Sequence, residues 1–199
     1  MTLKKLVIAT ANKGKYKEFE YLTETYGKNF AEKIIFAPEI SNLIVEETGK
    51  TYSENAMLKA RAWAEKSGLP CLADDSGLEV EALDGAPGLF SARIIKGNDG
   101  DKISWLLNEL KNFSNRRARF AASLALCVPE EFILICGGFC YGKIGQAEKG
   151  SNGFGYDPVF IPDGFEKTFA ELPFEIKNSI SHRTNAFKKI VELIKNLSL

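Results

Sequence analysis

The amino-acid sequence predicts an α/β fold. Short apolar runs typical of buried strands alternate with segments in which apolar residues recur every three or four positions, as on one face of a helix. No internal repeat or low-complexity segment interrupts this alternation. The chain has 199 residues, of which 45% are hydrophobic, and this is enough to bury a core. We therefore expect residues 1–199 to form a single domain, or at most two small lobes.

The first part of the chain predicts one strand and two helices. Leu6–Ala9 is a buried-strand run, and the apolar spacing of residues 16–26 predicts a helix after a short loop. A second helix is expected to begin near Thr51, which can form a capping box with Glu54, and to end at Gly68.

The same patterns predict the later elements. The run "CLA" is a strand that ends at Asp74 and Asp75, and "GLEVEAL" after it suggests a second strand or one arm of a hairpin. Two helices are expected over residues 103–110 and 187–197, and two long strands over residues 118–128 and 131–141. The loop "KGSNGFGYDP" follows these strands.

Charge and hydropathy limit the partners. Lysine plus arginine and aspartate plus glutamate number 26 each, so no net charge draws the chain to nucleic acid or to an anionic membrane. The run "RRAR" is one short basic segment, more typical of a solvated strand start than of a nucleic-acid interface. "MTLKKLVIAT" lacks a cleavage site, and no apolar stretch approaches the ~20 residues of a membrane span. We expect a cytoplasmic protein that binds neither membrane nor nucleic acid.

The cysteines are expected to be buried free thiols. They lie in apolar surroundings, and the one CxxxC pair lacks the second pair of ligands that a zinc site needs. A disulfide or a zinc site is the alternative, which a small secreted scaffold would favour. The four are Cys71, Cys127, Cys136 and Cys140.

The adjacent carboxylates Asp74 and Asp75 need a chemical reason, because two buried acids repel unless a cation or hydrogen-bond donors face them. Neighbouring side chains on a strand point to opposite faces, so the two acids need not share one ion. With Glu46 and Glu47 they form a carboxylate set typical of Mg²⁺, which prefers oxygen ligands and phosphates. The alternative for each glutamate is a solvated turn, and for Lys59 an exposed helical position.

The segment "TANKGK" between the first strand and the first helix can wrap its amides around phosphate, with lysines adding charge. It is not a Walker loop, because it has one glycine, and Tyr16 stands where that motif needs Ser or Thr. The alternative is that Asn12 caps the helix and both lysines are solvated. The segment comprises Thr10, Ala11, Asn12, Lys13, Gly14 and Lys15.

Two later segments carry further candidates. Phe154, Gly155, Tyr156 and Asp157 combine aromatic rings with flexible glycine, which suits stacking on a planar base, although aromatic residues are as often core. The sole histidine is His182, which together with Arg183 is expected at the start of the last helix. There the pair can donate to a ring oxygen or a phosphate, although a lone histidine is usually structural or on the surface.

Several of these segments, in one order from Thr10 to Arg183, resemble the Ham1/RdgB family, the inosine triphosphate pyrophosphatases. The segments are "TANKGK", "EETGKTYSENAMLKARAWA", "LADDSGLEVEALDGAPGLFSAR", "GFGYDPVF" and "ELPFEIKNSISHR". The resemblance implies an elongated two-lobed α/β fold on a long mixed sheet flanked by helices, with an active-site cleft between the lobes and usually a homodimer. It also implies Mg²⁺-dependent hydrolysis of the noncanonical purine nucleoside triphosphates ITP, dITP and XTP to the monophosphate and pyrophosphate.

The resemblance also implies residue roles. Asp75 matches the catalytic acid that activates water and meets the metal, Glu46 matches the metal-binding glutamate, and Asp74 and Glu47 are supporting acids. A one-residue shift would exchange Glu46 and Glu47. The triphosphate contacts implied are Thr10 to Lys15, Lys59 and Ser76, and the nucleoside contacts are Phe154 to Asp157, Lys177, His182 and Arg183. Ala11 stands where the family commonly has glycine, which matters only if that residue needs a positive φ.

Two rival functions remain open from the sequence. A pyrophosphatase of the Maf type has a similar fold and acts on modified pyrimidine nucleotides. A nucleotide-binding sensor would keep the lysines and the aromatic loop but need not keep Asp74, Asp75 and Glu46 together.

Overall fold

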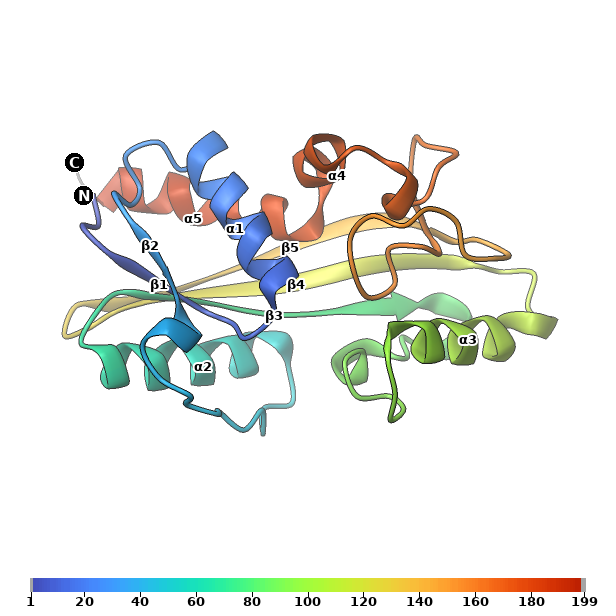
Figure 1. The fold of residues 1–199 in the computed structure, drawn as a ribbon, viewed down its shortest axis with the longest axis horizontal. Coiled ribbons are helices and arrows are strands. Elements are labelled where there is room, and N and C mark those ends of the chain that lie inside the picture. Colours follow the sequence, from blue (N-terminus) through green and yellow to red (C-terminus); the bar gives the residue numbers. More distant parts are fainter. Residues whose placement is uncertain (1, 198–199) are drawn as a thin grey trace. The chain divides into compact units, whose positions relative to one another are not determined.

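The structure, a computed structural model that describes residues 2–197, confirms the α/β fold (Figure 1). The chain divides into two compact units, and its strands β3, β4 and β5 contribute residues to both. The first unit comprises residues up to Asp75, Ala122–Gly138, and the residues from Arg183 onward. The second unit comprises Ser76–Ala121 and Phe139–His182.

The strands form one mixed six-stranded sheet with the order β2-β1-β3-β4-β5-β6. β1 pairs in parallel with β2 and with β3, so that Val7 lies opposite Cys71, whereas β5 and β6 are antiparallel. The strands are β1 Leu6–Ala9, β2 Ile34–Phe36, β3 Cys71–Val80, β4 Arg117–Val128, β5 Phe132–Ile144 and β6 Phe160–Pro162.

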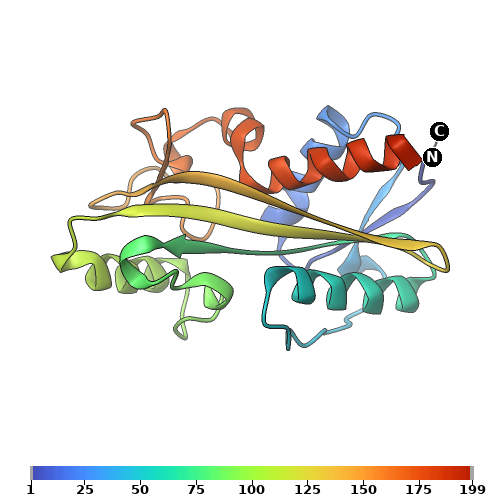
Figure 2. The same cartoon turned by 180° about the vertical axis from the view of Figure 1, so that it is seen from behind.

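Three helices cover the sheet of the first unit. Helices α1 (Lys13–Thr25) and α5 (His182–Leu197) lie on one face, and α2 (Tyr52–Ser67) lies on the other (Figures 1 and 2). The sequence dictates where α2 begins and ends. Thr51 and Glu54 form the predicted capping box, and Gly68 terminates the helix at φ +67°, which glycine adopts without strain.

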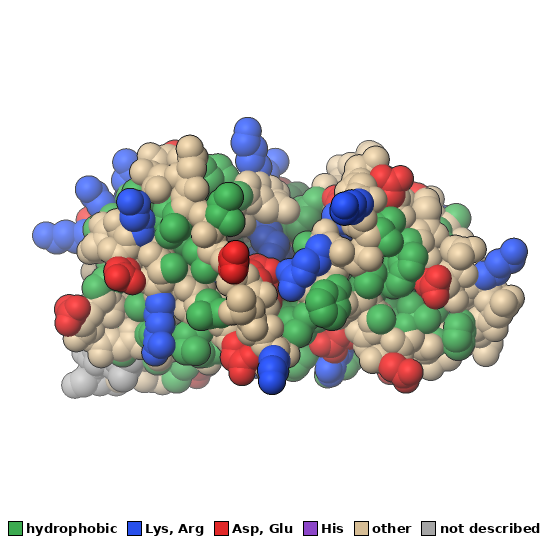
Figure 3. Space-filling view, turned by 90° about the horizontal axis from the view of Figure 1, so that it is seen from below, with side chains coloured by type: hydrophobic (Ala, Val, Ile, Leu, Met, Phe, Trp, Pro, Cys, Tyr) green, Lys and Arg blue, Asp and Glu red, His purple; other side chains and the backbone are tan. Residues whose placement is uncertain are grey.

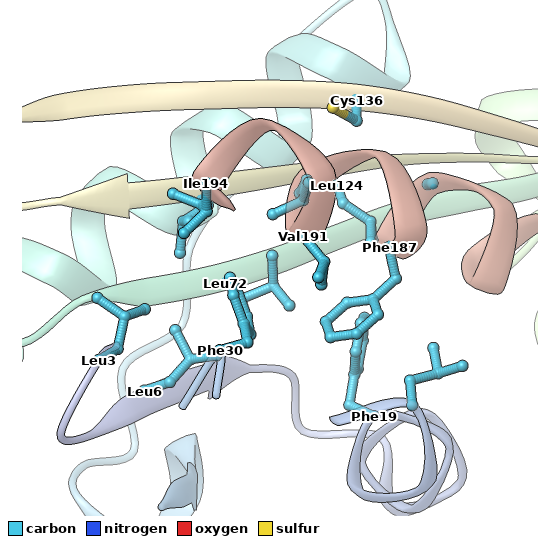
Figure 4. Packing of buried hydrophobic residues seen from close by; sticks show 14 of the residues in the cluster. Leu3, Leu6, Phe19, Phe30, Leu72, Leu124, Cys136, Phe187, Val191 and Ile194 are labelled. Carbon is cyan, nitrogen blue, oxygen red and sulfur yellow. The ribbon is translucent and has the colours of Figure 1, made fainter. Parts of the chain in front are cut away.

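Each face of this sheet buries its own hydrophobic cluster. On one face, Phe19 of α1 and Phe187 of α5 pack against Leu72 of β3 (Figure 4). On the other face, Ala60 and Trp63 of α2 belong to a second cluster. Because both faces are covered, β1 is buried at every position, as is usual for parallel strands.

The second unit has its own core and two helices, α3 (Asp99–Glu109) and α4 (Phe174–Ile180). Its cluster combines Leu106 of α3 with Phe120 of β4 and Phe160 of β6. The short 3-10 helices of the chain are η1 Ala37–Glu39, η2 Glu81–Leu83, η3 Gly88–Phe90, η4 Leu110–Asn112 and η5 Phe169–Glu171.

One element differs from the sequence prediction in a way that matters for function. Residues 71–80 form a single ten-residue strand, so Asp74 and Asp75 lie in its interior and not at the end of a three-residue strand. The prediction was wrong because adjacent acids usually end a buried strand, whereas here cations from other elements reach them. The short strands β2 and β6 and the helix α4 were not predicted.

The cysteines agree with the sequence prediction. All four cysteines are buried and free, and burial raises the pKa of the Cys140 thiol to about 12. Within residues 2–197, no helix is long and apolar enough to cross a membrane. Lysine, arginine and acidic side chains are interspersed on the face that Figure 3 shows.

Candidate active site

Asp74 and Asp75 lie side by side on β3, and both are almost fully buried, at 3% and 7% exposure. Their side chains point to opposite faces of the sheet, as the alternation of a strand requires. The groups that contact Asp74 come from α1 and α5, whereas those that contact Asp75 come from α2. The predicted separation of the two acids is therefore confirmed.

Asp74 lies in a network of buried charges. Its Oδ2 is 2.6 Å from Nζ of Lys15 and 3.2 Å from Nη2 of Arg183, and Arg183 also bonds to the buried Glu18. Burial alone would raise the pKa of Asp74, but Arg183 and Lys15 outweigh it and hold the pKa well below its usual range. Asp74 is therefore an ionised carboxylate with two cations already bound.

Arg183 is only 2% exposed, and it forms ion pairs with two acids of the first unit, Glu18 and Asp74. A buried guanidinium between two carboxylates is stable because each partner satisfies the other's charge and hydrogen bonds. This arrangement uses Arg183 to fasten α5 to α1 and β3. Its expected contact with the nucleoside stays a prediction.

Asp75 has weaker positive partners than Asp74. Its Oδ2 accepts a 3.0 Å hydrogen bond from Nδ2 of Asn55, and its Oδ1 is 3.6 Å from Nζ of Lys59. Burial raises the pKa of Asp75, Lys59 and Asn55 offset part of this rise, and the nearby Glu47 and Asp74 add to it. Asp75 is therefore the more basic of the two carboxylates.

Lys59 connects Asp75 to the segment that precedes α2. Its Nζ is 2.6 Å from Oε1 of Glu47 and donates a 2.8 Å hydrogen bond to the backbone oxygen of Asp74. Lys59 is thus not the freely solvated helical lysine of the alternative reading, since its side chain is only 14% exposed.

Asn55, which was not predicted from the sequence, bonds both to the segment before α2 and to Asp75 of β3. The residue is fully buried, and its Oδ1 accepts a 2.8 Å hydrogen bond from N of Gly49 while its Nδ2 binds Asp75. A Cβ on residue 49 would lie 2.6 Å from Oδ1 of Asn55, so this close approach requires glycine. Asn55 therefore couples the loop that carries Glu47 to the carboxylate of Asp75.

The two candidate glutamates have different surroundings. Burial alternates along residues 41–50, so Glu46 is exposed whereas its neighbour Glu47 is half-buried and contacts Lys59. The structure thus brings Glu47 to Lys59 and Asp75, and it leaves Glu46 at the surface. The metal-binding role of Glu46 stays a prediction.

The loop before α1 contains the expected helix cap, whereas its phosphate binding stays a prediction. Oδ1 of Asn12 accepts a 3.0 Å hydrogen bond from N of Lys15, which is the predicted helix cap, and Oγ1 of Thr10 accepts from N of Asn12. Lys13 is exposed, but Lys15 is drawn inward to Asp74. Ala11 is not among the described residues with positive φ, so alanine is tolerated there.

The carboxylates beside β3 do not form a complete metal-binding site by themselves. They fit the partial set of protein ligands that Mg²⁺ usually has in nucleotide enzymes. Within residues 2–197, no three His, Cys, Asp or Glu side chains come together to hold a metal. Mg²⁺ in nucleotide enzymes is usually bound by one or two carboxylates, with waters and substrate phosphates as the other ligands. Asp75 fits such a role because a single cation at 3.6 Å leaves it incompletely paired, whereas Asp74 is occupied by Lys15 and Arg183.

In the second unit, the glycine-rich loop is held by two carboxylates. Asp157 accepts a 2.9 Å hydrogen bond from N of Phe154 and forms a buried ion pair with Lys177 of α4. Asp99, at the start of α3, accepts a 2.7 Å hydrogen bond from N of Gly155. Nζ of Lys177 lies 4.8 Å from the ring centroid of Phe154, which fixes that ring by a cation–π contact.

The remaining candidates of this unit are partly structural. Tyr156 is 4% exposed and donates a 3.2 Å hydrogen bond to the backbone oxygen of Ser91, so its ring belongs to the core. His182 stacks on Phe120 with ring centroids 4.8 Å apart and planes at 14°. Ser76 is half-buried on β3, directly after Asp75. Of the two aromatic residues of the loop, Tyr156 is buried in the core, whereas Phe154 is half-buried and keeps part of its surface accessible.

The chain belongs to the Ham1 family, whose model matches residues 6–193. It is 45% identical over 192 residues to a protein of Prochlorococcus marinus named dITP/XTP pyrophosphatase, covering 96% of this chain and 94% of the relative. A protein of the same name from Aquifex aeolicus is 42% identical, with 96% and 97% covered. The solved structure of the Staphylococcus aureus Ham1 protein matches with a TM-score of 0.84 at 39% identity, covering 97% of this chain and 99% of that one.

Proposed function

We propose that the protein hydrolyses noncanonical purine nucleoside triphosphates, namely ITP, dITP and XTP, to the nucleoside monophosphate and pyrophosphate. Membership of the Ham1 family over nearly the whole chain and the names of the relatives support this activity. The observation that carries it is the unequal pairing of the two β3 acids. Asp74 is neutralised by Lys15 and Arg183, and Asp75 keeps a carboxylate available for chemistry.

In this proposal, Asp75 is the general base that orients and deprotonates the attacking water. The water attacks the α-phosphorus in line with the departing pyrophosphate, so positioning and charge neutralisation supply most of the catalysis. Lys15 and Lys59 are assigned to the phosphates, together with the backbone amides of residues 10–14. Both lysines already lie against β3, at 2.6 Å from Asp74 and 3.6 Å from Asp75, which limits the reorganisation that substrate binding requires.

We assign the cofactor as Mg²⁺, held by Asp75 with Glu46 or Glu47 and supported by Asp74. When bound, the ion would neutralise charge on the phosphate oxygens. Glu47 is favoured over Glu46 by its contact with Lys59 beside Asp75. Lys59 contacts both Glu47 and Asp75, which offsets the repulsion between the two acids.

The base is assigned to the residues of the second unit. Phe154 provides a ring for stacking; Lys177 makes a cation–π contact with that ring, and Asp157 accepts a hydrogen bond from the backbone amide of Phe154. Inosine and xanthosine carry an acceptor at position 6 where adenosine carries an amino group, so a donor from His182, Arg183 or a helix amide would select the 6-oxo bases. A site built on such hydrogen bonds can discriminate by up to about 10⁴ to 10⁵.

Three further assignments complete the proposal. We propose that residues 1–199 act as one catalytic domain, since the family model spans both units. We also propose that the protein is a homodimer, without a nucleic-acid or membrane partner. The cytoplasm is its proposed location, because that compartment holds the nucleotide pool on which it would act.

Product analysis tests the proposal directly. ITP, XTP, GTP, ATP and UTP are each incubated with enzyme and Mg²⁺, and pyrophosphate is measured against single phosphate. We expect pyrophosphate from ITP and XTP, and we expect Asp75→Asn to abolish turnover because the amide cannot accept the proton. Asp84→Asn is the matched control, since Asp84 is exposed and in a left-handed conformation that asparagine also adopts.

Other outcomes would redirect the assignment. A preference for pyrimidine triphosphates would favour the Maf-type function, and tight binding without turnover would favour a sensor. If Asp75→Asn retains a kcat near that of the wild type, the role of Asp75 is wrong even if the substrates are right.

A further inference from the structure

The second unit contains a cavity of about 580 Å³, and none of the residues proposed to bind the substrate lines it. It lies where the start of β4 meets the end of β5, and residues of β6 and of the following segment complete its wall. Cavities of this size are typical of small-molecule sites. Its lining therefore shows what kind of ligand it could hold.

The cavity is lined by four basic side chains, Arg116, Arg117, Lys143 and Lys149, and by no acidic side chain among the residues that the structure describes. This is a local excess of positive charge in a chain whose net charge is zero. Arg117 is neutralised by a bidentate pair with Asp163, with N–O distances of 2.7 and 3.1 Å. The remaining basic residues, Arg116, Lys143 and Lys149, determine the charge of the cavity.

Arg116 is a fixed cation without a carboxylate partner in the described part of the chain. Its Nε, Nη1 and Nη2 donate to the backbone oxygens of Ile144, Leu110 and Gly145 at 2.9, 3.2 and 2.7 Å. Carbonyl oxygens orient the guanidinium but do not cancel its charge, and burial lowers its pKa. Three bonds use three of its five N–H donors, so two remain for a ligand, with their orientation already set.

Lys143 and Lys149 are exposed, and neither forms an ion pair within residues 2–197. Their backbones are nevertheless held. Lys143 lies opposite Ile161 in the pairing of β5 with β6, and the backbone oxygen of Lys149 accepts a 2.7 Å hydrogen bond from Oγ1 of Thr168. The two ammonium groups are exposed, but the backbone positions that carry them are fixed in the cavity wall beside the Arg116 guanidinium.

Two acids interact with these lysines, and both are bound by other groups. Asp163 interacts electrostatically with Lys143, but its carboxylate is held by Arg117. Glu171 interacts with Lys149 and Lys167, but its carboxylate accepts a hydrogen bond from N of Thr168 as part of a capping box. Neither acid therefore neutralises the lysines by direct contact.

From this placement of three unneutralised cations around one cavity, we propose that it is a second ligand site for a small oxyanion with two or more negative charges, of the phosphate or pyrophosphate type. A multivalent oxyanion can accept from the Arg116 fork and from both ammonium groups at once, and charge-assisted bonds are the strong ones. The hydroxyl of Ser114 and the amide of Gln146, which also line the cavity, offer further donors.

The lining favours an inorganic anion over a nucleotide. Among the described residues that line the cavity there is no aromatic ring, and its apolar part consists of Ile144, Ala147 and Ile161. Base recognition usually relies on stacking against an aromatic side chain, which is worth about 1–3 kcal/mol per base. A nucleoside would thus add bulk without adding a strong contact.

Amide chemical shifts test the site residue by residue. Inorganic pyrophosphate is titrated into the labelled protein without divalent metal, and the backbone amides of Ser114, Asn115, Gly145 and Gln146 are followed. We expect saturable shifts in the wild type and binding about tenfold weaker or more in Lys143→Ala/Lys149→Ala, which removes two charge-assisted contacts. Both lysines are exposed, so the variant should fold as the wild type does.

Lys96→Ala/Lys111→Ala is the matched control, because it removes the same charge from the same unit outside the cavity lining. Unchanged affinity in the control supports a specific site. Equal weakening in both variants, or no saturable shift of these amides in the wild type, overturns the proposal. ADP in a parallel titration identifies the source of the oxyanion: affinity no higher than that of pyrophosphate supports the inorganic assignment, and tighter binding overturns it.

Discussion

The two units hold their candidate functional side chains in place by different interactions. In the first unit, charged side chains hold one another, since Glu18, Asp74, Lys15 and Arg183 form one buried network. In the second unit, Asp157 and Asp99 hold backbone amides of the glycine-rich loop, and Lys177 holds the ring of Phe154. The first arrangement positions charge, and the second positions a flat apolar surface.

This difference indicates how each unit would fail. A network of buried charges is intolerant of the loss of one member, because the remaining charges stay buried and unpaired. A loop held by amide hydrogen bonds is intolerant of added atoms, because its backbone approaches its anchors closely. Three pairs of variants, ordered by the largest effect expected in each pair, test this contrast.

Arg183→Met should have the largest effect. It leaves Glu18 and Asp74 buried, at 2% and 3% exposure, without their shared guanidinium. Removing one partner of a buried ion pair typically costs about 3–5 kcal/mol of the free energy of unfolding. Urea unfolding measures this loss.

Arg117→Met is the control for that loss. Its pair with Asp163 is bidentate, but the two side chains are 46% and 53% exposed. Exposed pairs contribute less than about 1 kcal/mol. If the two variants lose the same stability, burial of the charges is not what makes the network of the first unit sensitive.

Gly153→Ala should damage the anchored loop of the second unit. Gly153 has φ +79°, and a Cβ there would lie 2.0 Å from Oδ2 of Asp157, the atom that binds Phe154 and Lys177. Backbone strain and the displaced carboxylate together should cost about 2–4 kcal/mol.

Gly155→Ala separates the two contributions. Gly155 also has a positive φ, +61°, but a Cβ there meets nothing within 4 Å. Only the backbone strain of about 1–2 kcal/mol should remain. Thermal or urea unfolding of both variants gives the comparison, and an equal loss would show that the carboxylate anchor of the loop is unimportant.

The smallest expected effects concern binding. They test whether Phe154 contacts the base and Lys59 contacts the phosphates of the proposed substrate. Inhibition by inosine should weaken about tenfold in Phe154→Leu, which removes a stacking surface, and inhibition by tripolyphosphate should not change. Lys59→Gln should show the reverse pattern, because it removes a phosphate-directed charge. Inhibition constants for both compounds measure the effects. If both variants weaken both inhibitors equally, the two sets of residues do not serve different ends of the substrate.

Elements with a long periodic pattern could be predicted from the sequence. The helices over residues 13–25, 52–67, 99–109 and 182–197 were expected close to where they lie, because their apolar stripes span several turns. The capping box of Thr51 and Glu54 was also predicted and is present. The strands β2 and β6 have three residues each, which is too short for any period to be recognised.

The partners of the candidate residues were harder to predict. Asp74 and Asp75 were found from their adjacency, and Lys15 from its loop, but nothing in the sequence connects Asp74 to Arg183. Glu18 lies three residues after Lys15 on one helix face, and this spacing was the available signal that both could belong to one cluster of charges. Asn55 gave no signal, because an asparagine within a helix is usually exposed.

The buried network of the first unit has a consequence for synthesis of the chain. Arg183 lies 165 residues after Glu18 and 109 residues after Asp74, so both acids leave the ribosome long before their cation does. Because chains are made from the amino terminus, the first unit cannot complete its charge network until its final helix has emerged. The residues of the second unit, which end at His182, have all been translated by then. The part of the protein that begins first is therefore finished last.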